Sequence, residues 1–184
     1  MFVKFLIVLF VFYNFTLEIR ANEKQLIINQ LINIDNITFD FEQTTNEKKE
    51  IGVCILVFDN KLLCKYKDSI QKEILINGKT LIVRKKRYDK IYFYPFKNSP
   101  LSKIFNKNDL INLIKESDYN LKRNIELTYL DKNNNKVIIY FEKDSYNFLG
   151  WKTIDQLQNE VNFTIKITNL NSKIDSKIFK IPSP

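Results

Sequence analysis

The sequence predicts a mainly β protein, built as an antiparallel barrel or a strongly curved sheet. Three observations favour this class. From residue 36 onward, most segments alternate apolar and polar residues with a period of two. Tight turns such as Asp59-Asn60 and Asn77-Gly78 separate these segments, and helical periodicity is confined to a few short stretches. The chain has 184 residues and shows no repeat or linker, so we expect a single domain.

Residues 1–21 are expected to be a secretory signal peptide and not part of the fold. Met1 to Lys4 form a short basic start, and the apolar run from Phe5 to Tyr13 is too short to span a bilayer. Ala21 is the expected last residue before cleavage. We therefore expect the folded domain at residues 22–184, in an exported and soluble protein.

The first element of this domain is predicted to be an amphipathic helix over residues 22–34. Its broad apolar face consists of Leu26, Ile27, Ile28, Leu31, Ile32 and Ile34. The pattern then changes, because Ile37, Phe39 and Phe41 alternate with polar residues as in a strand. Further strands are predicted at about 50–58, 61–68, 71–77, 79–86, 89–95, 123–131, 136–143, 146–154 and 160–169.

Turn residues connect these strands. Asn77-Gly78 is the favoured pair for a two-residue hairpin turn of type I′. Asp175 to Phe179 are expected to close the chain with a helical turn.

Two short helices are predicted to interrupt the strands between residues 95 and 120. Pro95 lacks the N–H that a β-ladder needs, so strand pairing should weaken there. Ser99 can cap a helix that starts at Pro100. The apolar face of that helix consists of Leu101, Ile104 and Phe105. A second helix is expected from Asp109 to Ser117. The first helix has two interpretations, ordinary core closure at a barrel end or a movable lid over an apolar cavity.

The two cysteines, Cys54 and Cys64, lie on adjacent strands of one predicted hairpin. A two-residue turn would place Cys64 opposite Ile55, and a three-residue turn would place it opposite Leu56. A disulfide needs Cα atoms within about 7 Å, and neither register brings the cysteines face to face. We therefore expect two buried free thiols.

The three-residue register, in which Phe58 pairs with Leu62, also predicts which side chains face inward. Lys61, Lys65 and Lys67 form the polar set on the return strand, so alternate residues should face the interior. The expected interior residues are Phe39, Phe41, Leu56, Phe58, Leu62 and Tyr66.

The segment from Val53 to Phe58 is apolar on both faces. A strand with one face in water should be half polar, so another element must cover its outer face. The helix at residues 22–34 is one candidate cover.

The composition argues against catalysis. The chain has no histidine, which removes the commonest general base and metal ligand. Carboxylates such as Glu42 and Asp155 lie in predicted strands without a nucleophile around them. We therefore expect a protein that is not an enzyme, with no catalytic residue, no metal and no cofactor.

The net charge of +8 could attract nucleic acid, anionic lipid or an acidic partner. The densest basic cluster runs from Arg84 to Arg87, where a hairpin tip is expected. A solvated basic surface is the plainer interpretation. The export signal argues against a nucleic-acid partner.

A series of short motifs along residues 26–182 forms a recognisable pattern. The motifs are Phe41-Glu42-Gln43, Ile76-Asn77-Gly78-Lys79, Tyr94-Pro95-Phe96 with Ser99-Pro100-Leu101, Leu149-Gly150-Trp151-Lys152 with Asp155, and Phe179-Lys180-Ile181-Pro182. In order and spacing this series resembles the periplasmic outer-membrane lipoprotein carriers of the LolA family. One departure concerns Phe58-Asp59, where the family usually has an Arg-Pro pair whose Arg is thought to hold the lid shut.

The resemblance implies an unclosed antiparallel β-barrel of the LolA/LolB type, with an N-terminal helix and short lid helices. The interior residues named above would line a cavity for lipoprotein acyl chains. The implied lid residues are Pro100, Leu101, Ile104 and Phe105.

The resemblance also implies a function. A monomeric periplasmic carrier would take acylated lipoproteins from an inner-membrane lipoprotein-releasing ABC transporter and pass them to an acceptor lipoprotein in the outer membrane. The alternative of the same fold is a periplasmic module that senses lipid or lipoprotein without shuttling.

Overall fold

The computed structural model describes residues 22–181 except 59, 100, 132–133 and 156. Within these residues, eleven strands form one antiparallel sheet. The strands are β1 (Asn36–Thr45), β2 (Lys48–Val57), β3 (Lys61–Tyr66), β4 (Lys72–Asn77), β5 (Thr80–Lys85), β6 (Lys90–Pro95), β7 (Asp118–Leu121), β8 (Ile125–Leu130), β9 (Lys136–Phe141), β10 (Phe148–Ile154) and β11 (Glu160–Leu170).

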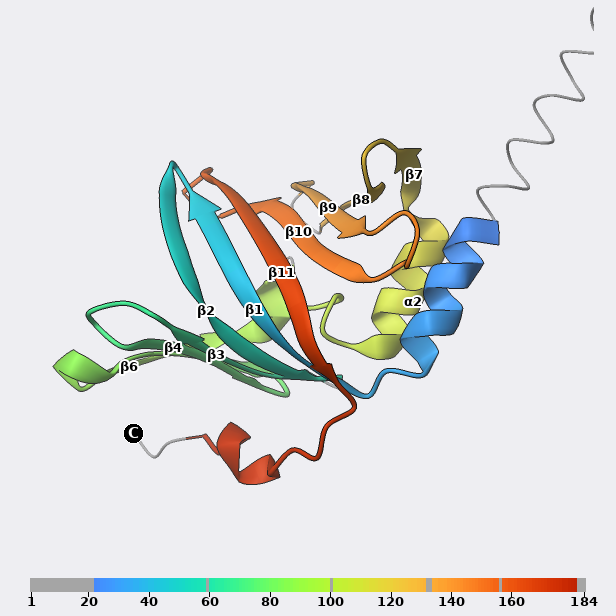
Figure 1. Cartoon of the computed structure of the whole chain (residues 1–184). Coiled ribbons are helices and arrows are strands. Elements are labelled where there is room, and N and C mark those ends of the chain that lie inside the picture. The colour runs from blue at the N-terminus through green and yellow to red at the C-terminus, as the bar shows by residue number, and fades with distance from the viewer. Residues whose placement is uncertain (1–21, 59, 100, 132–133, 156, 182–184) are drawn as a thin grey trace, which may run out of the picture.

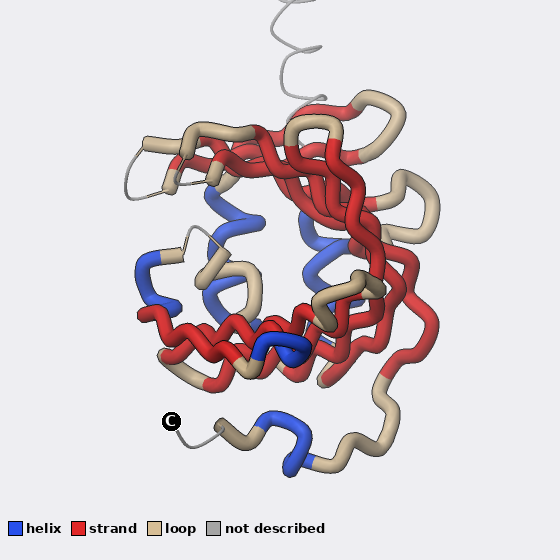
Figure 2. Tube along the Cα trace, turned by 90° about the vertical axis from the view of Figure 1, so that its left-hand side faces the viewer, coloured by secondary structure: helices blue, strands red, loops and turns tan. Residues whose placement is uncertain are grey.

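The sheet consists of two meanders that meet at its centre. The strand order is β6-β5-β4-β3-β2-β1-β11-β10-β9-β8-β7, so β1 and β11 are neighbours and β6 and β7 are the two edges. The sheet curves strongly around its own interior without closing (Figures 1 and 2). The predicted class, a mainly β protein with an unclosed antiparallel barrel, is confirmed.

Two helices lie inside the curve of the sheet (Figure 2). Residues 22–32 form the N-terminal helix, and α2 spans Lys107–Glu116, close to the predicted Asp109–Ser117. Asn106 caps α2 by accepting a hydrogen bond from the N–H of Asp109 at 3.1 Å. Three short 3-10 helices complete the described chain: η1 (Lys86–Tyr88), η2 (Phe96–Asn98) and η3 (Ser176–Phe179). The last of these confirms the closing helical turn.

The main core lies between the concave face of the sheet and the two helices. We call it the interior cluster, and it includes Ile27, Ile28, Leu31 and Ile34 from the N-terminal segment, Leu110, Leu113 and Ile114 from α2, and the inward residues of both meanders. Leu26 and Ile32, on the margins of the predicted helical stripe, stay 37% and 52% exposed. The helix therefore turns a narrower face inward than its sequence predicts.

A second core covers the convex face of β3 to β5. This outer cluster contains the buried residues Leu63, Leu75, Ile82 and Phe179, with partly buried neighbours that include Ile55 and Val57. The outer face is therefore covered, as expected, but not by the N-terminal helix that was one candidate. The cover is the C-terminal segment, whose η3 lies outside the sheet (Figure 1) and is held by a 3.0 Å hydrogen bond from Asn77 Nδ2 to the Phe179 carbonyl.

The cysteines form a disulfide, which corrects the expectation of free thiols. The β2–β3 turn consists of residues 58–60, because Val57 pairs with Lys61. This register places Cys54 directly opposite Cys64, with a Cα–Cα distance of 4.1 Å. Both expected registers were wrong because each placed Phe58 inside the ladder. Residues two apart on a strand share a face, so Leu62, Cys64 and Tyr66 still point inward as expected.

The β4–β5 turn also differs from its prediction. Asn77 pairs with Thr80, so the two-residue loop is Gly78-Lys79 and not Asn77-Gly78. Gly78 has φ +60°, which fits a loop that needs a positive φ at its first position, as in a type II′ turn.

Candidate functional site

Aromatic side chains run through the interior cluster as a connected series of rings. Trp151 stacks on Phe163 with ring centroids 4.2 Å apart, and Phe163 stacks on Phe41 at 4.8 Å. Phe105 meets the edge of Trp151 at 5.6 Å, and Tyr66 meets Phe41 at 4.8 Å. The series joins strands from both meanders, so it spans the interior from β3 to β10. The ring faces are apolar, so a ligand beside them would be bound by van der Waals contact.

All six residues expected to face inward are buried in the interior cluster. They are Phe39 (1% exposed), Phe41 (4%), Leu56 (1%), Phe58 (6%), Leu62 (5%) and Tyr66 (7%). Lys65, on the opposite face of β3, is exposed. Sequence reasoning missed their partners Phe148, Trp151 and Phe163 on β10 and β11, although the apolar alternation of Phe163, Ile165 and Ile167 is a signal that could have found Phe163.

One small pocket in the interior is lined wholly by described residues. This pocket among Leu31, Ile34, Phe58 and Phe148 has a volume of about 10 Å³, which is room for a single water at most. Pockets for small molecules usually measure about 300–1,000 Å³. A ligand of that size can enter this pocket only if its lining residues move apart.

The segment best placed to move comprises η2 and the loop that joins it to α2. Its described residues are 96–99 and 101–106, and we call it the plug. Its Ile104 and Phe105 are 0% and 2% exposed, and Leu101 is partly buried against the same cluster. The helix expected to begin at Ser99 is absent from the described residues of this segment. Ser99 instead ends η2, residues 101–106 form turns, and the predicted lid residue Pro100 lies outside the described residues.

The plug is held by few backbone contacts. Apart from the bonds that Asn106 accepts at the start of α2, its described backbone hydrogen bonds to other elements are Asn60 N–H to the Phe105 carbonyl at 3.0 Å and Phe96 N–H to the Lys79 carbonyl at 2.8 Å. Burial of Ile104 and Phe105 contributes about 3–6 kcal/mol, at roughly 1.5–3 kcal/mol for each side chain. Most of the attachment is therefore apolar, and a ligand with an apolar surface can replace it.

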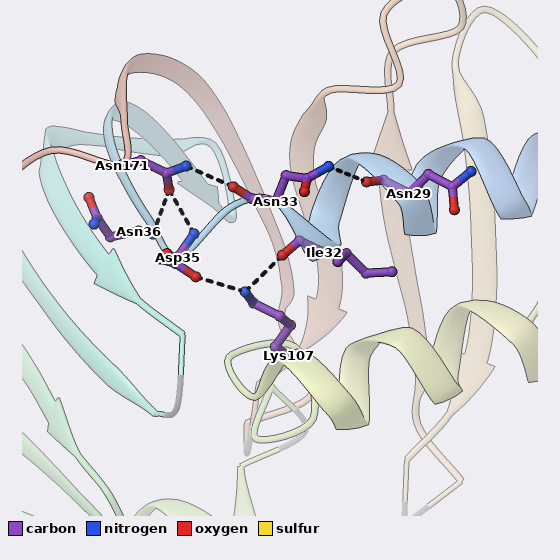
Figure 3. Close-up of polar contacts among 7 residues, drawn as sticks. All are labelled: Asn29, Ile32, Asn33, Asp35, Asn36, Lys107 and Asn171. Atoms are coloured by element: carbon purple, nitrogen blue, oxygen red, sulfur yellow. Dashed lines mark hydrogen bonds and ion pairs between the residues drawn. The ribbon is translucent and has the colours of Figure 1, made fainter.

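The two helices hold each other through two lysines. Lys24 donates from Nζ to the carbonyls of Lys115 at 3.0 Å and Ser117 at 2.6 Å, at the C-terminal end of α2. Lys107, the first residue of α2, donates to the Ile32 carbonyl at 3.3 Å and to Asp35 Oδ1 at 3.1 Å (Figure 3). A cation at a helix C-terminus donates to carbonyls that lack a helical partner, and it is attracted to the negative end of the helix dipole. Burial lowers the pKa of Lys24, and the charge of Asp118 opposes this shift.

Asn171 fixes the junction between the N-terminal helix and β1. Its Oδ1 accepts from the N–H groups of Asp35 at 2.7 Å and Asn36 at 3.3 Å, and its Nδ2 donates to the Asn33 carbonyl at 2.7 Å (Figure 3). The end of the N-terminal helix is thus tied to the end of β11. Movement of this helix would have to pivot at the junction.

Phe58 lies beside this junction. Its N–H donates to the Asp35 carbonyl at 3.0 Å, and its ring lies 5.8 Å from Lys107 Nζ. Its side chain belongs to the interior cluster, so an apolar ring lies beside the junction. The polar contacts between the two helices come from Lys24 and Lys107.

Tyr66 is the polar member of the aromatic series, and its hydroxyl has a structural partner. Tyr66 donates its hydroxyl to Gln43 Oε1 at 2.8 Å, and Lys72 Nζ lies 3.7 Å from the Tyr66 ring centroid. Burial raises the pKa of Tyr66, and the charges of Glu50 and Asp68 add to the shift. Such a phenol is neutral at ordinary pH and unsuited to act as a base.

The two carboxylates considered for catalysis, Asp155 and Glu42, make structural contacts. Asp155 accepts from the Asn159 N–H at 2.9 Å and the Asn159 side chain at 3.0 Å, which closes the β10–β11 turn. These hydrogen bonds lower the pKa of Asp155. Glu42 pairs with Lys49 at 3.0 Å on the surface. Across the described residues, no group of three or more His, Cys, Asp or Glu side chains could hold a metal ion.

No helix in the described part of the chain is long and apolar enough to cross a membrane.

Comparison with known proteins places these features in a family. The family model for outer membrane lipoprotein carrier protein LolA matches residues 32–182. An uncharacterized conserved protein from Thermus thermophilus has a similar structure, with a TM-score of 0.54 and 8% identity over 88% of this chain and 94% of that chain. A comparison with curated proteins gave no match.

Two further solved structures are similar at lower TM-scores. A LolA superfamily protein from Nitrosomonas europaea has a TM-score of 0.41 and 10% identity, over 85% of this chain and 97% of that chain. Lipoprotein LppX from Mycobacterium tuberculosis has a TM-score of 0.49 and 9% identity, over 86% of this chain and 98% of that chain.

Proposed function

Because this chain belongs to the LolA family of outer membrane lipoprotein carrier proteins, we propose that it is a carrier that binds the acyl chains of lipoproteins and performs no catalysis. In this proposal it receives lipoproteins from an inner-membrane ABC transporter and passes them to an acceptor lipoprotein of the outer membrane. The family match carries the proposal. The apolar interior with its weakly attached plug supports it.

The interior has the chemistry that this cargo requires. A 16-carbon acyl chain in water costs on the order of 12 kcal/mol, at about 0.8 kcal/mol for each CH₂ group. Methylene groups offer no hydrogen bonds, so a site for them needs apolar surface alone. The stacked rings of Phe41, Phe163 and Trp151 supply such a surface once the plug has left.

We further propose that residues 1–21 direct export and are removed, and that the carrier works as a monomer in the periplasm. The Cys54–Cys64 disulfide supports this location, because disulfides form and persist in oxidising compartments. N-terminal sequencing of the protein released by osmotic shock should find a start near Asn22. Recovery of a cytosolic protein that retains Met1 would contradict export.

The test of cargo binding uses the plug. Replacing both Leu101 and Phe105 by Ser should loosen the plug, so a hydrophobic dye should bind the empty protein more strongly. The matched control replaces Leu157 and Leu170, which are exposed, by Ser. Mass spectrometry of the native protein should detect acylated species that copurify.

If the double variant binds dye no better than the control and only unfolds at a lower temperature, the plug is ordinary core and the cavity proposal fails.

A sensing module of the same fold is the second candidate, and Phe58 favours it. The arginine that is thought to drive release in the family is replaced here by an apolar ring. A loaded sensor would keep its lipoprotein when an acceptor is added, whereas a carrier would transfer it. We expect transfer, and its absence with a competent acceptor would favour the sensor.

A further inference from the structure

The hairpin of β5, η1 and β6 carries a surface that the carrier function does not use. Residues 88–94 contain four exposed aromatic side chains: Tyr88 (55%), Tyr92 (38%), Phe93 (44%) and Tyr94 (48%). Exposed aromatic residues are unusual on an edge strand, where natural proteins place charges to prevent association. β6 is an edge of the sheet and has β5 as its one partner among the described strands.

Basic residues surround these rings. Residues 84–90 contain five basic side chains and one acidic side chain, Asp89. Two of the five cations share one carboxylate, because buried Glu73 pairs with Lys86 at 2.6 Å and with Arg84 at 3.5 Å. The remaining three, Lys85, Arg87 and Lys90, have no ion pair in the described structure. Lys85 Nζ lies 5.6 Å from the Tyr92 ring centroid, and Arg87 donates a hydrogen bond to the Ser69 carbonyl.

The aromatic side chains lie on both faces of the edge. Tyr92 and Tyr94 point to the face of Leu81, which packs against the interior cluster. Phe93 points to the opposite face, since its partner Ile82 belongs to the outer cluster. A protein stacked on one face would cover only one of these sets. A lipid interface into which the edge is immersed covers both.

We propose that this hairpin docks the protein on the surface of an anionic phospholipid bilayer. Tyrosine and phenylalanine settle at the boundary between head groups and acyl chains, and lysine and arginine are attracted to anionic head groups. Figure 1 shows the β6 hairpin at the end of the molecule away from α2. Docking at β6 sets an edge of the open sheet beside the lipid. The docking surface does not depend on cargo.

The experiment measures co-sedimentation of the purified empty protein with vesicles of phosphatidylcholine, alone or mixed with phosphatidylglycerol. We expect binding to the mixed vesicles, weakened by salt because the Debye length falls from about 10 Å at 0.1 M to about 3 Å at 1 M. A variant with K85Q, R87Q and K90Q should bind on the order of 100-fold more weakly, at roughly fivefold for each basic residue. Arg84 and Lys86 are left unchanged, so Glu73 keeps its partners.

Two further variants separate the contributions. The charge-matched control is K143Q with K166Q and K173Q, three exposed lysines outside the hairpin, and it should bind like the parent. Y88S with F93S should weaken vesicle binding while the net charge stays the same. All variants share the parent's N-terminus, so residues 1–21 cannot produce a difference between them.

Equal binding to the two kinds of vesicle, or an equal loss in the control, would overturn the proposal. Tighter binding to soluble polyglutamate than to vesicles, with no effect of the aromatic variant, would assign the surface to an acidic protein and would also overturn it. Copurified acyl species and dye uptake report on the interior, so failure of cargo binding remains a separate result.

Discussion

At the scale of single residues, small side chains make room for the large rings of the interior. Gly52 lies opposite Phe41 in the ladder, and a Cβ added to it would lie 2.2 Å from the Lys65 carbonyl oxygen and 2.6 Å from the Phe41 ring. A glycine at this position lets the ring lie against the backbone of β2. The position of Phe41 in the aromatic series therefore depends on the absence of a side chain at Gly52.

Replacing Gly52 by Ala should lower the free energy of unfolding by about 1–3 kcal/mol, because overpacking forces the ring or the strand to shift. The control is Gly78→Asn, since nothing lies within 4 Å of a Cβ there and Asn tolerates a positive φ. Urea unfolding of both variants gives the comparison. Equal costs at the two positions would show that packing on Phe41 is not the cause.

Tyr66 makes stability dependent on alkaline pH. Its pKa is raised above the ordinary value of 10.0 mainly by burial, so the folded state favours the neutral phenol. This contribution is fully present below pH 10 and is lost as the pH rises through the folded-state pKa. The variant Tyr66→Phe should therefore lose less stability than the parent above pH 10, measured by chemical unfolding. Tyr88→Phe, on the exposed tip, is the control and should follow the parent.

At the scale of elements, the β2–β3 hairpin is constrained by a covalent bond as well as by its ladder. The Cys54–Cys64 bond links the two strands inside the interior cluster, ten residues apart in the sequence. The hairpin turn contacts the plug through Asn60 and the N-terminal segment through Phe58. The plug and the N-terminal segment therefore both contact a hairpin that is held by a covalent bond.

Removing the disulfide should lower the free energy of unfolding by about 2–3 kcal/mol, from the loop entropy released in the unfolded chain. The variant Cys54→Ala/Cys64→Ala, compared with the oxidised parent in urea, measures this cost. Reductant should destabilise the parent and leave the double variant unchanged. An equal response to reductant in both proteins would rule out the bond as the source.

The helix pair gives a separate prediction. Lys107→Met keeps the length of the side chain but removes its bonds to Ile32 and Asp35, so the N-terminal helix should detach more readily. We expect a loss of about 0.5–1.5 kcal/mol in unfolding free energy and stronger binding of a hydrophobic dye. Lys115→Met, at the exposed end of α2, should change neither. Unchanged dye binding in Lys107→Met would mean that this contact does not restrain access.

Period and register explain which elements could be predicted from sequence. Alternation of apolar residues reveals strands and their inward faces, and so the interior residues of β1 to β3 were found. Alternation does not reveal the length of a turn, and one residue in the β2–β3 turn decides whether Cys54 meets Cys64. The helix after Ser99 was expected from a local capping signal. The described residues instead form turns, with N–H groups of Ser102 and Ile104 bonded to the carbonyls of Ser99 and Leu101, and a capping signal alone does not distinguish a turn from a helix. Phe179 covers the outer face of β3 to β5, far from it in the sequence, and a local pattern does not reveal such a contact.

At the scale of the whole molecule, the structure separates a fixed sheet from inner parts that can move. The sheet is held by ladders across all eleven described strands and by the disulfide. The plug and the N-terminal helix are attached mainly by apolar burial and a few hydrogen bonds. An acyl ligand should therefore displace the inner parts and leave the sheet in place.

Hydrogen exchange can test this division. When the protein is loaded with an acylated peptide, the amide of Asn60, which bonds to the Phe105 carbonyl, should exchange faster. Amides of β1 and β11 should stay protected. Loss of protection across β1 and β11 on loading would mean that the sheet itself opens. Unchanged exchange at Asn60 would mean that the plug stays bound.

The pairing of β1 with β11 also determines when the molecule can fold. Residues 36–45 lie beside residues 160–170 at the centre of the sheet, and the outer cluster is complete only when Phe179 is in place. Neither contact can form until almost the whole chain has been synthesised, and pairings between distant residues form slowly. A nascent chain of this kind stays unfolded for longer than one with a local topology. In the export proposed above, machinery that threads extended chains would then have time to engage it, and folding would be completed on the far side of the membrane.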